Sequence, residues 1–97
     1  MAYGVVLVFD EVSVEDYWAV NAKLGIEADG SGDWPAGMLM HSAGPTGSGW
    51  LVSEVWETKA DQEVFMAGRL GAALGEVGVA APVQVIESDL ENYRIQP

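Results

Sequence analysis

The alternation of apolar and polar positions divides the chain into four predicted strands and two predicted helices. A continuous apolar run at residues 3–9 ends at Asp10 and Glu11, which is typical of a central strand covered on both faces. Shorter apolar runs predict the other strands, and a short edge extension is expected near the end. These segments are 37–43, 50–57 and 83–87, with the extension at 92–95.

Helical periodicity fills the two segments between the first and second and between the third and fourth strands. Ser13 stands at the N-cap of the first helix, and Gly25 follows it as a C-cap. Thr58 stands at the N-cap of the second helix, whose interior glycines weaken it by roughly 1 kcal/mol each relative to alanine. The predicted helices span 13–24 and 58–74.

Three connecting segments differ in character. Residues 27–35 are polar and glycine-rich, and a loop of this length in so small a domain is typical of a lid or a dimer arm. Residues 44–49, Gly-Pro-Thr-Gly-Ser-Gly, join the two central strands as a hairpin. Residues 75–82 are expected to form a loop.

The order β, α, β, β, α, β predicts an α+β fold, the ferredoxin-like sandwich with a four-stranded antiparallel sheet. The length of 97 residues fits a single domain, 1–97. Both sides of the central hairpin are apolar, so we expect the sheet to be buried twice, by its helices and by a second copy. One side carries Met38, Met40, Leu51 and Val55, and the other carries Leu39, Ala43, Trp50, Val52 and Trp56.

Charge and composition exclude several classes of partner. Fifteen acidic residues against four basic ones give a net charge of −11, which disfavours nucleic acid and anionic membrane surfaces. The acidity fits either solubility alone or a preference for neutral or cationic ligands. The absence of cysteine excludes disulfides and thiolate chemistry. With no signal peptide or long apolar stretch in the sequence, a cytoplasmic location is expected.

The only histidine is a candidate for acid–base chemistry. If Gly44 pairs with Gly49, His41 and Glu54 become diagonal neighbours on one face of the hairpin. A neighbouring carboxylate orients an imidazole and raises its pKa, as a general base requires. The alternative is a core histidine satisfied by Glu54 or a backbone carbonyl. One histidine with one carboxylate falls short of a metal site, so no metal is expected.

Two further polar side chains lie on helix faces that should be buried. Asn21 shares the apolar face of the first helix, where its amide either points into a cavity or bonds a neighbouring carbonyl. Arg69 lies at the edge of the apolar stripe of the second helix. It either pairs with a surface acid or clamps an oxygen of a substrate or of a partner subunit.

The chain is also rich in aromatic residues. About half of them are expected in the core, and the rest are numerous enough to wall a pocket for a flat apolar ligand. The residues considered are Tyr17, Trp18, Trp34, Trp50, Trp56 and Tyr93.

Several of these segments together resemble the dimeric α/β-barrel superfamily, and more narrowly its antibiotic-biosynthesis-monooxygenase-like domains. The resemblance spans roughly residues 3–87. It is carried first of all by Trp56-Glu57-Thr58-Lys59 and Phe65. The other matching segments are V-N-A-K-L-G-I at 20–26, P-A-G-M-L-M-H at 35–41, G-W-L-V-S-E-V-W at 49–56 and R-L-G-A-A-L at 69–74.

The resemblance implies a homodimer whose sheets face each other, with a pocket between each sheet and its helices. Members of the superfamily include cofactor-free oxygenases, haem degraders, isomerases, cyclases and proteins of unknown chemistry. Haem degraders carry a tryptophan and a ligating histidine on the second helix. Phe65 and Gly75 stand at those positions here, which disfavours haem degradation.

The leading hypothesis from the sequence is therefore a cofactor-independent, monooxygenase-like enzyme acting on a small apolar, aromatic or polyketide-like molecule. His41 is assigned as base or polariser, Glu54 as its orienter and Asn21 as a hydrogen-bond donor. An isomerase or cyclase using the same pocket, or a non-enzymatic dimeric binding protein, are the alternatives. The residues assigned to substrate binding are Trp56, Trp50, Tyr17, Trp18, Phe65 and Arg69.

Overall fold

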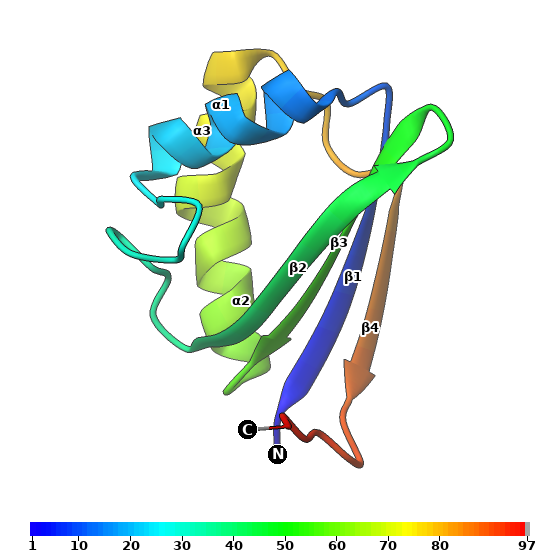
Figure 1. Ribbon diagram of the computed structural model, residues 1–97. Helices are drawn as coiled ribbons and strands as arrows, with labels where there is room; N and C mark the ends of the chain where they lie inside the picture. Colours follow the sequence, from blue (N-terminus) through cyan, green and yellow to red (C-terminus); the bar gives the residue numbers. More distant parts are fainter. Residues whose placement is uncertain (97) are drawn as a thin grey trace.

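The computed structural model describes residues 1–96 and confirms the predicted ferredoxin-like fold. One four-stranded antiparallel sheet, in the order β2-β3-β1-β4, carries the helices on one face (Figure 1). The elements are β1 (Tyr3–Asp10), α1 (Val14–Leu24), β2 (Met38–Thr46), β3 (Gly49–Trp56), α2 (Lys59–Phe65), η1 (Met66–Leu70), α3 (Gly71–Val77) and β4 (Gln84–Asp89).

Both helical segments start at the positions predicted from their N-cap residues, Ser13 and Thr58. The Ser13 hydroxyl accepts from the Asp16 backbone N–H, and the Asp16 carboxylate accepts from the Ser13 N–H, which completes a capping box. Gly25 ends α1 with a φ of 77°, a conformation that favours glycine. The Thr58 hydroxyl caps α2 by accepting from the Asp61 backbone N–H.

The second helix is longer and less regular than predicted. Its middle turn, η1, is a π-helix, and the helix continues through α3 to Val77 rather than stopping at residue 74. The N–H of Gly71 bonds to the carbonyl of Met66, and a Cβ at Gly71 would lie 3.1 Å from that oxygen. Glycine here thus lets the wider turn close, and the helix stops only at Gly78, where φ is positive.

The predicted register of the hairpin is wrong by two residues. Thr46 pairs with Gly49, so only Gly47 and Ser48 form the turn, and His41 lies directly opposite Glu54. Gly47, with a φ of 54°, supplies the conformation that the first position of such a turn needs. Pro45 is accommodated because β2 is an edge strand.

A β-bulge at residue 39 also changes which residues share a face. Met38 pairs with Trp56 and Met40 with Val55, so Leu39 is the extra residue. Met38 therefore lies on the helix-covered face, whereas it was predicted on the opposite face with Met40. At the other end of the sheet, β4 ends at Asp89 rather than residue 87, and residues 92–95 form no strand.

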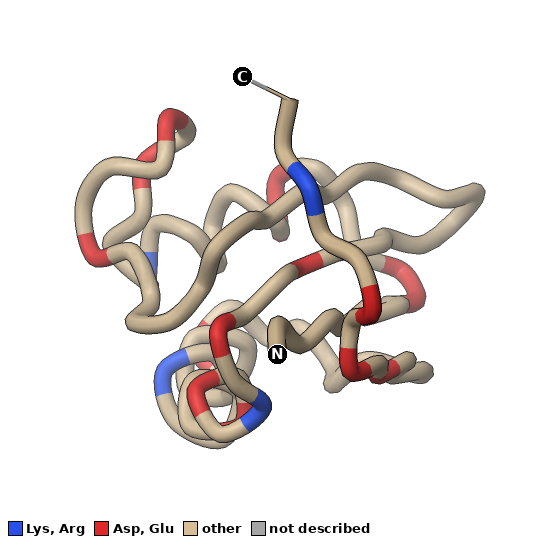
Figure 2. Tube along the Cα trace, turned by 90° about the horizontal axis from the view of Figure 1, so that it is seen from below, with Lys and Arg blue, Asp and Glu red and all other residues tan. Residues whose placement is uncertain are grey.

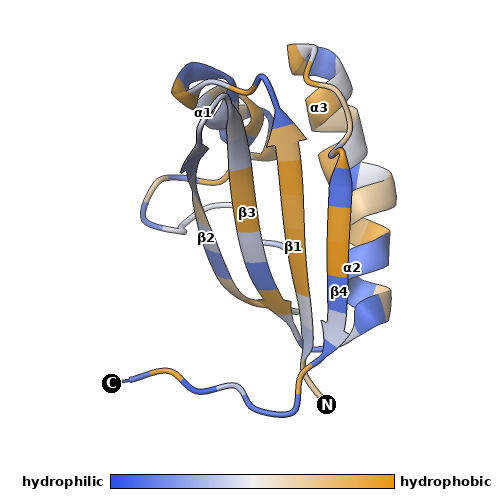
Figure 3. Ribbon diagram, turned by 90° about the vertical axis from the view of Figure 1, so that its right-hand side faces the viewer, coloured by the Kyte–Doolittle hydropathy of each residue, from blue (hydrophilic) through white to orange (hydrophobic). Residues whose placement is uncertain are grey.

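The core lies between the sheet and the helices. Every second residue of β1, from Tyr3 to Phe9, is buried against the helices, and Trp56 on β3 is fully buried. β1 and the middle of β4 are strongly apolar, whereas β2 is mostly pale or hydrophilic and β3 is mixed (Figure 3). On the opposite face no helix covers the sheet, and Val6, Val8 and Leu51 are only half-buried there.

Acidic residues are spread along the whole chain rather than gathered on one element (Figure 2). In residues 1–96, no helix combines the length and apolar character needed to cross a membrane.

Tyr3 makes stability depend on pH at the alkaline end. Its buried hydroxyl donates to Glu87 Oε1 at 2.5 Å, and burial followed by this bond raises the phenol pKa well above its ordinary value of 10.0. The folded chain therefore keeps a proton that the unfolded chain releases, so stability falls as pH rises above about 10. We expect Tyr3→Phe to flatten this fall, measured by urea unfolding between about pH 8 and about pH 11. Tyr93→Phe, which also removes one phenol, is the control; an equal flattening in both variants would contradict the assignment.

Candidate functional site

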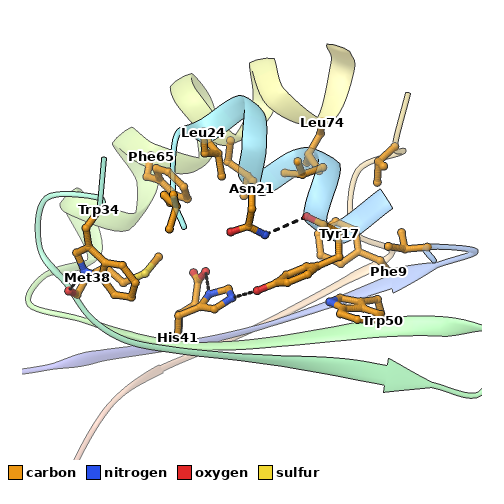
Figure 4. Close-up of a pocket in the computed structure, with 16 residues that line it drawn as sticks. Phe9, Tyr17, Asn21, Leu24, Trp34, Met38, His41, Trp50, Phe65 and Leu74 are labelled. Carbon is orange, nitrogen blue, oxygen red and sulfur yellow. Dashed lines mark hydrogen bonds and ion pairs between the residues drawn. The ribbon is translucent and has the colours of Figure 1, made fainter. Parts of the chain in front are cut away.

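An apolar cavity lies between the sheet and the helices (Figure 4). Its volume is about 70 Å³, against roughly 10–15 Å³ that one buried water needs by the same measure. The cavity thus has room for several waters or a small organic molecule. Its walls are mostly aliphatic and aromatic, with a few polar groups from α1, β2 and β3. The polar side chains that line it are Tyr17, Asn21, His41 and Glu54, together with the indoles of Trp34 and Trp50.

His41 and Glu54 make the contact that the sequence predicted, in a different register. His41 Nδ1 lies 3.0 Å from Glu54 Oε2, across the strand pair β2–β3. The other carboxylate oxygen, Oε1, accepts from Trp56 Nε1 at 3.1 Å. Glu54 is only 4% exposed, so the carboxylate is held between these two donors. A carboxylate can only accept, so the imidazole donates to Glu54 from Nδ1. In the neutral ring this leaves Nε2 of His41 as an acceptor.

Tyr17 completes a continuous chain of hydrogen bonds. Its hydroxyl lies 2.6 Å from His41 Nε2, on the side opposite Glu54. Burial raises the pKa of the phenol above its usual range; hydrogen bonding with the Asn21 side chain partly opposes this rise, and the negative charge of Glu54 adds to it. The phenol therefore keeps its proton at neutral pH and donates it to Nε2. Tyr17, His41 and Glu54 thus form one hydrogen-bonded series along which a proton could pass, and the three residues are called the proton relay.

Asn21 sits one helical turn after Tyr17 on the same face of α1. Its Nδ2 donates to the Tyr17 backbone carbonyl at 2.9 Å, and the side chain also lines the cavity. Both placements considered from the sequence therefore occur together. An amide carries two N–H donors, so this bond still leaves Asn21 capacity to bond to a ligand.

The aromatic residues are divided between cavity and core. Trp50, Phe65 and Tyr17 line the cavity. Trp56 lies behind the cavity in the core and has no exposed surface. Trp18 is on the outer side of α1 and is 46% exposed. Neither residue lines the cavity. Trp34, from the loop after α1, does line it and donates its indole N–H to the Met38 carbonyl at 2.8 Å.

Arg69 holds the loop after α1 against the helices. Its Nη2 donates to the carbonyls of Leu24 at 2.9 Å and Asp33 at 2.6 Å, and its guanidinium lies over the Phe65 ring. These partners are backbone oxygens, and within residues 1–96 Arg69 forms no ion pair with a surface acid, which was one of the two alternatives from the sequence. The side chain does not line the cavity. It fixes the segment that carries Trp34.

The contact between Tyr17 and His41 is the main feature that the sequence did not predict. Tyr17 was expected only as an aromatic wall. A signal was present, since a phenol on a buried helix face needs a hydrogen-bond partner and the chain has a single histidine to offer. In residues 1–96, no three histidine or carboxylate side chains gather in a way that would hold a metal ion.

Comparison with known proteins gives the fold. No family model matches the chain, and no curated protein matches it. A structure from Chloroflexus aurantiacus J-10-fl, described as a candidate antibiotic biosynthesis monooxygenase, is 13% identical with a TM-score of 0.64, covering 99% of this chain and 100% of that chain. The chain shares the ferredoxin-like fold of this structure.

Two other structures with the same fold carry no assigned activity. The NE2512 protein of Nitrosomonas europaea, of unknown function, is 18% identical with a TM-score of 0.64, covering 99% of this chain and 93% of that one. A protein from Bacteroides fragilis NCTC 9343, described as dimeric with a ferredoxin-like fold, is 14% identical with a TM-score of 0.56, covering 92% and 96%. At these identities the likeness confirms the predicted fold only. Any activity has to be inferred from the residues of the site.

Proposed function

We propose that this protein is a cofactor-independent enzyme that transfers a proton from a small, largely apolar molecule bound in the cavity. The single observation that carries the proposal is the proton relay, which ends in the Tyr17 hydroxyl at an apolar cavity. Glu54 is buried and the other two residues of the relay are partly buried, which matters because charges and dipoles interact more strongly where less water is present.

The relay moves one proton in two short steps. The acidic proton of the bound molecule passes to the Tyr17 oxygen, while the Tyr17 proton passes to His41 Nε2. The bound molecule becomes an anion, Tyr17 stays neutral and the imidazole becomes an imidazolium facing the Glu54 carboxylate. Running the same steps backward returns a proton to a different atom of the molecule, which is an isomerisation. His41 keeps 24% of its side chain exposed, which gives the relay exchange with solvent.

Oxygenation is the finer form of this proposal. An electron-rich carbanion, such as one formed at a methylene group of a hydroxylated aromatic, reacts with O₂ without a metal. One oxygen atom becomes a carbonyl oxygen and the other leaves as water, so that CH₂ and O₂ give C=O and H₂O. The fold shared with a candidate antibiotic biosynthesis monooxygenase supports this form.

Isotope exchange tests the proposal without knowledge of the substrate. Resorcinol in D₂O exchanges its ring protons through a carbanion-like form, and NMR follows the loss of each signal. We expect the protein to accelerate this exchange above the buffer rate, and Tyr17→Phe to abolish the acceleration. An oxygen electrode on the same samples separates oxygenation from simple proton transfer. Binding of resorcinol with no acceleration would refute an enzymatic role.

That last outcome would favour a second candidate function, a ligand-binding protein without chemistry. The observation on its side is that both ring nitrogens of His41 already have partners within the protein. A histidine satisfied in this way also serves as a structural link between α1 and the sheet.

We further propose that a second copy of the chain covers the open face of the sheet. The central strands present the apolar residues Val6, Val8 and Leu51 there, and no helix covers them. A face of this kind is normally buried against a partner. The similar protein from Bacteroides fragilis is described as dimeric, which supports a homodimer.

Light scattering coupled to size exclusion tests the dimer. We expect the chain of 10.3 kDa to elute with twice that mass, and Leu51→Glu to elute as a monomer, because each copy would bury a carboxylate in the seam. Val64→Glu, at an exposed position of α2, should remain dimeric. A monomeric wild type, or a dimeric Leu51→Glu, would rule out pairing through this face.

A further inference from the structure

Trp50 carries the one buried side-chain nitrogen or oxygen that lacks a hydrogen-bond partner within residues 1–96. The side chain is 5% exposed and lines the cavity, and its Nε1 is fully shielded. The indole of the buried Trp56 donates to Glu54, and even the indole of Trp34, which is 39% exposed, donates to the Met38 carbonyl. Because buried donors are almost always satisfied, the free N–H of Trp50 calls for a specific explanation.

The position of Trp50 joins this donor to the proton relay. Its ring lies 4.9 Å from that of Tyr17, centre to centre, with the two planes tilted by 31°. In the close-up the indole lies on the sheet side beneath Tyr17, with its nitrogen turned toward the interior of the site (Figure 4). Trp50 and Tyr17 thus line the same cavity side by side, with the indole next to the tyrosine end of the relay.

We propose that Trp50 Nε1 donates a hydrogen bond to an oxygen of the bound ligand, and so selects neutral molecules that carry a carbonyl or hydroxyl oxygen. The inference rests on the proposed function and adds a binding contact to it. Once the relay removes a proton, negative charge gathers on that oxygen, and the indole N–H stabilises it. A donor placed where charge develops is the usual way in which a site favours an anion.

Charge explains why the ligand enters in its neutral form. The chain has a net charge of −11, and none of the residues that line the cavity is lysine or arginine. A carboxylate or phosphate would be repelled at a distance and left unpaired inside. A neutral ketone or phenol meets neither obstacle, and it offers the acceptor that Trp50 lacks.

Two probes of equal shape test the role of Trp50. Cyclohexanone has an acceptor oxygen where methylenecyclohexane has a CH₂ group. We expect cyclohexanone to shift the assigned indole N–H signal of Trp50 downfield in the NMR spectrum, with the hydrocarbon leaving it in place. Trp50→Phe should weaken binding of the ketone about five- to tenfold, the worth of one hydrogen bond, and leave binding of the hydrocarbon unchanged.

The outcomes separate this inference from the proposed function. Tyr17→Phe, which should abolish the acceleration of isotope exchange, should keep the Trp50 shift with cyclohexanone. Isotope exchange that persists with no ketone-induced shift would overturn the role of Trp50 and leave the relay standing. An indole N–H signal shifted upfield by the Tyr17 ring and indifferent to ketone would likewise overturn it. The wild-type spectrum alone decides these points if Trp50→Phe fails to fold.

Discussion

Replacing His41 with alanine should lower the rate of resorcinol proton exchange by about 10²- to 10⁴-fold, the usual contribution of a positioned acid–base group. The reason is geometric. His41 Nε2 is the acceptor for the Tyr17 proton at 2.6 Å, and without it that proton has no place to go as the ligand proton arrives. The exchange rate in D₂O, followed by NMR at equal protein concentration, measures the effect.

Loss of fold has to be separated from loss of chemistry in this variant. His41→Ala leaves the buried Glu54 with one donor fewer, which costs roughly 1–3 kcal/mol of stability. His41→Asn keeps a polar side chain beside Glu54 and should be more stable but equally slow. Ser42→Ala, on the opposite face of the same strand, is the matched control and should exchange protons at the wild-type rate. Wild-type exchange in a folded His41→Ala would refute the relay.

Replacing Trp56 with alanine should lower the free energy of unfolding by about 3–5 kcal/mol, as large core truncations do. Trp56 has no exposed surface, packs 5.5 Å from the Phe65 ring centre to centre, and donates to Glu54. Its loss leaves a void and also removes one of the two donors to the Glu54 carboxylate. The total free energy of unfolding of a small domain is roughly 5–15 kcal/mol, so the expected loss is a large fraction of it.

Chemical denaturation at one fixed protein concentration measures this loss, because dimerisation would make stability depend on concentration. Trp56→Phe keeps much of the ring and should lose less than the alanine variant. Trp18→Ala removes a side chain that is 46% exposed and should cost much less. Equal losses for Trp56→Ala and Trp18→Ala would contradict the placement of Trp56 in the core.

Local signals in the sequence were enough to predict the order of elements. Ser13, Thr58 and Gly25 act within one helical turn, so their effect does not depend on the rest of the fold. The alternation of buried residues along β1 is equally local. The helix-covered sheet follows because these elements have few other ways to bury their apolar faces.

Register and side-chain pairing depend on features that a local pattern does not contain. The extra residue at Leu39 moves Met38 to the other face of the sheet, and the two-residue turn moves His41 opposite Glu54. The π-helical turn at Met66–Leu70 likewise gives no clear sequence signal. Of the residues named from the sequence, His41, Glu54 and Asn21 line the cavity, whereas Trp18, Trp56 and Arg69 do not. The bond from Tyr17 to His41 depends on the relative placement of α1 and β2, which no local pattern contains.

The tautomer of His41 tests the central claim most directly. As the only histidine, it gives a single imidazole in a ¹H–¹⁵N correlation spectrum, where the proton-bearing nitrogen is identified from its shift. The relay predicts that neutral His41 carries its proton on Nδ1, toward Glu54, with Nε2 accepting from Tyr17. A proton on Nε2, or a rapidly averaging pair of tautomers, would show that no such relay exists.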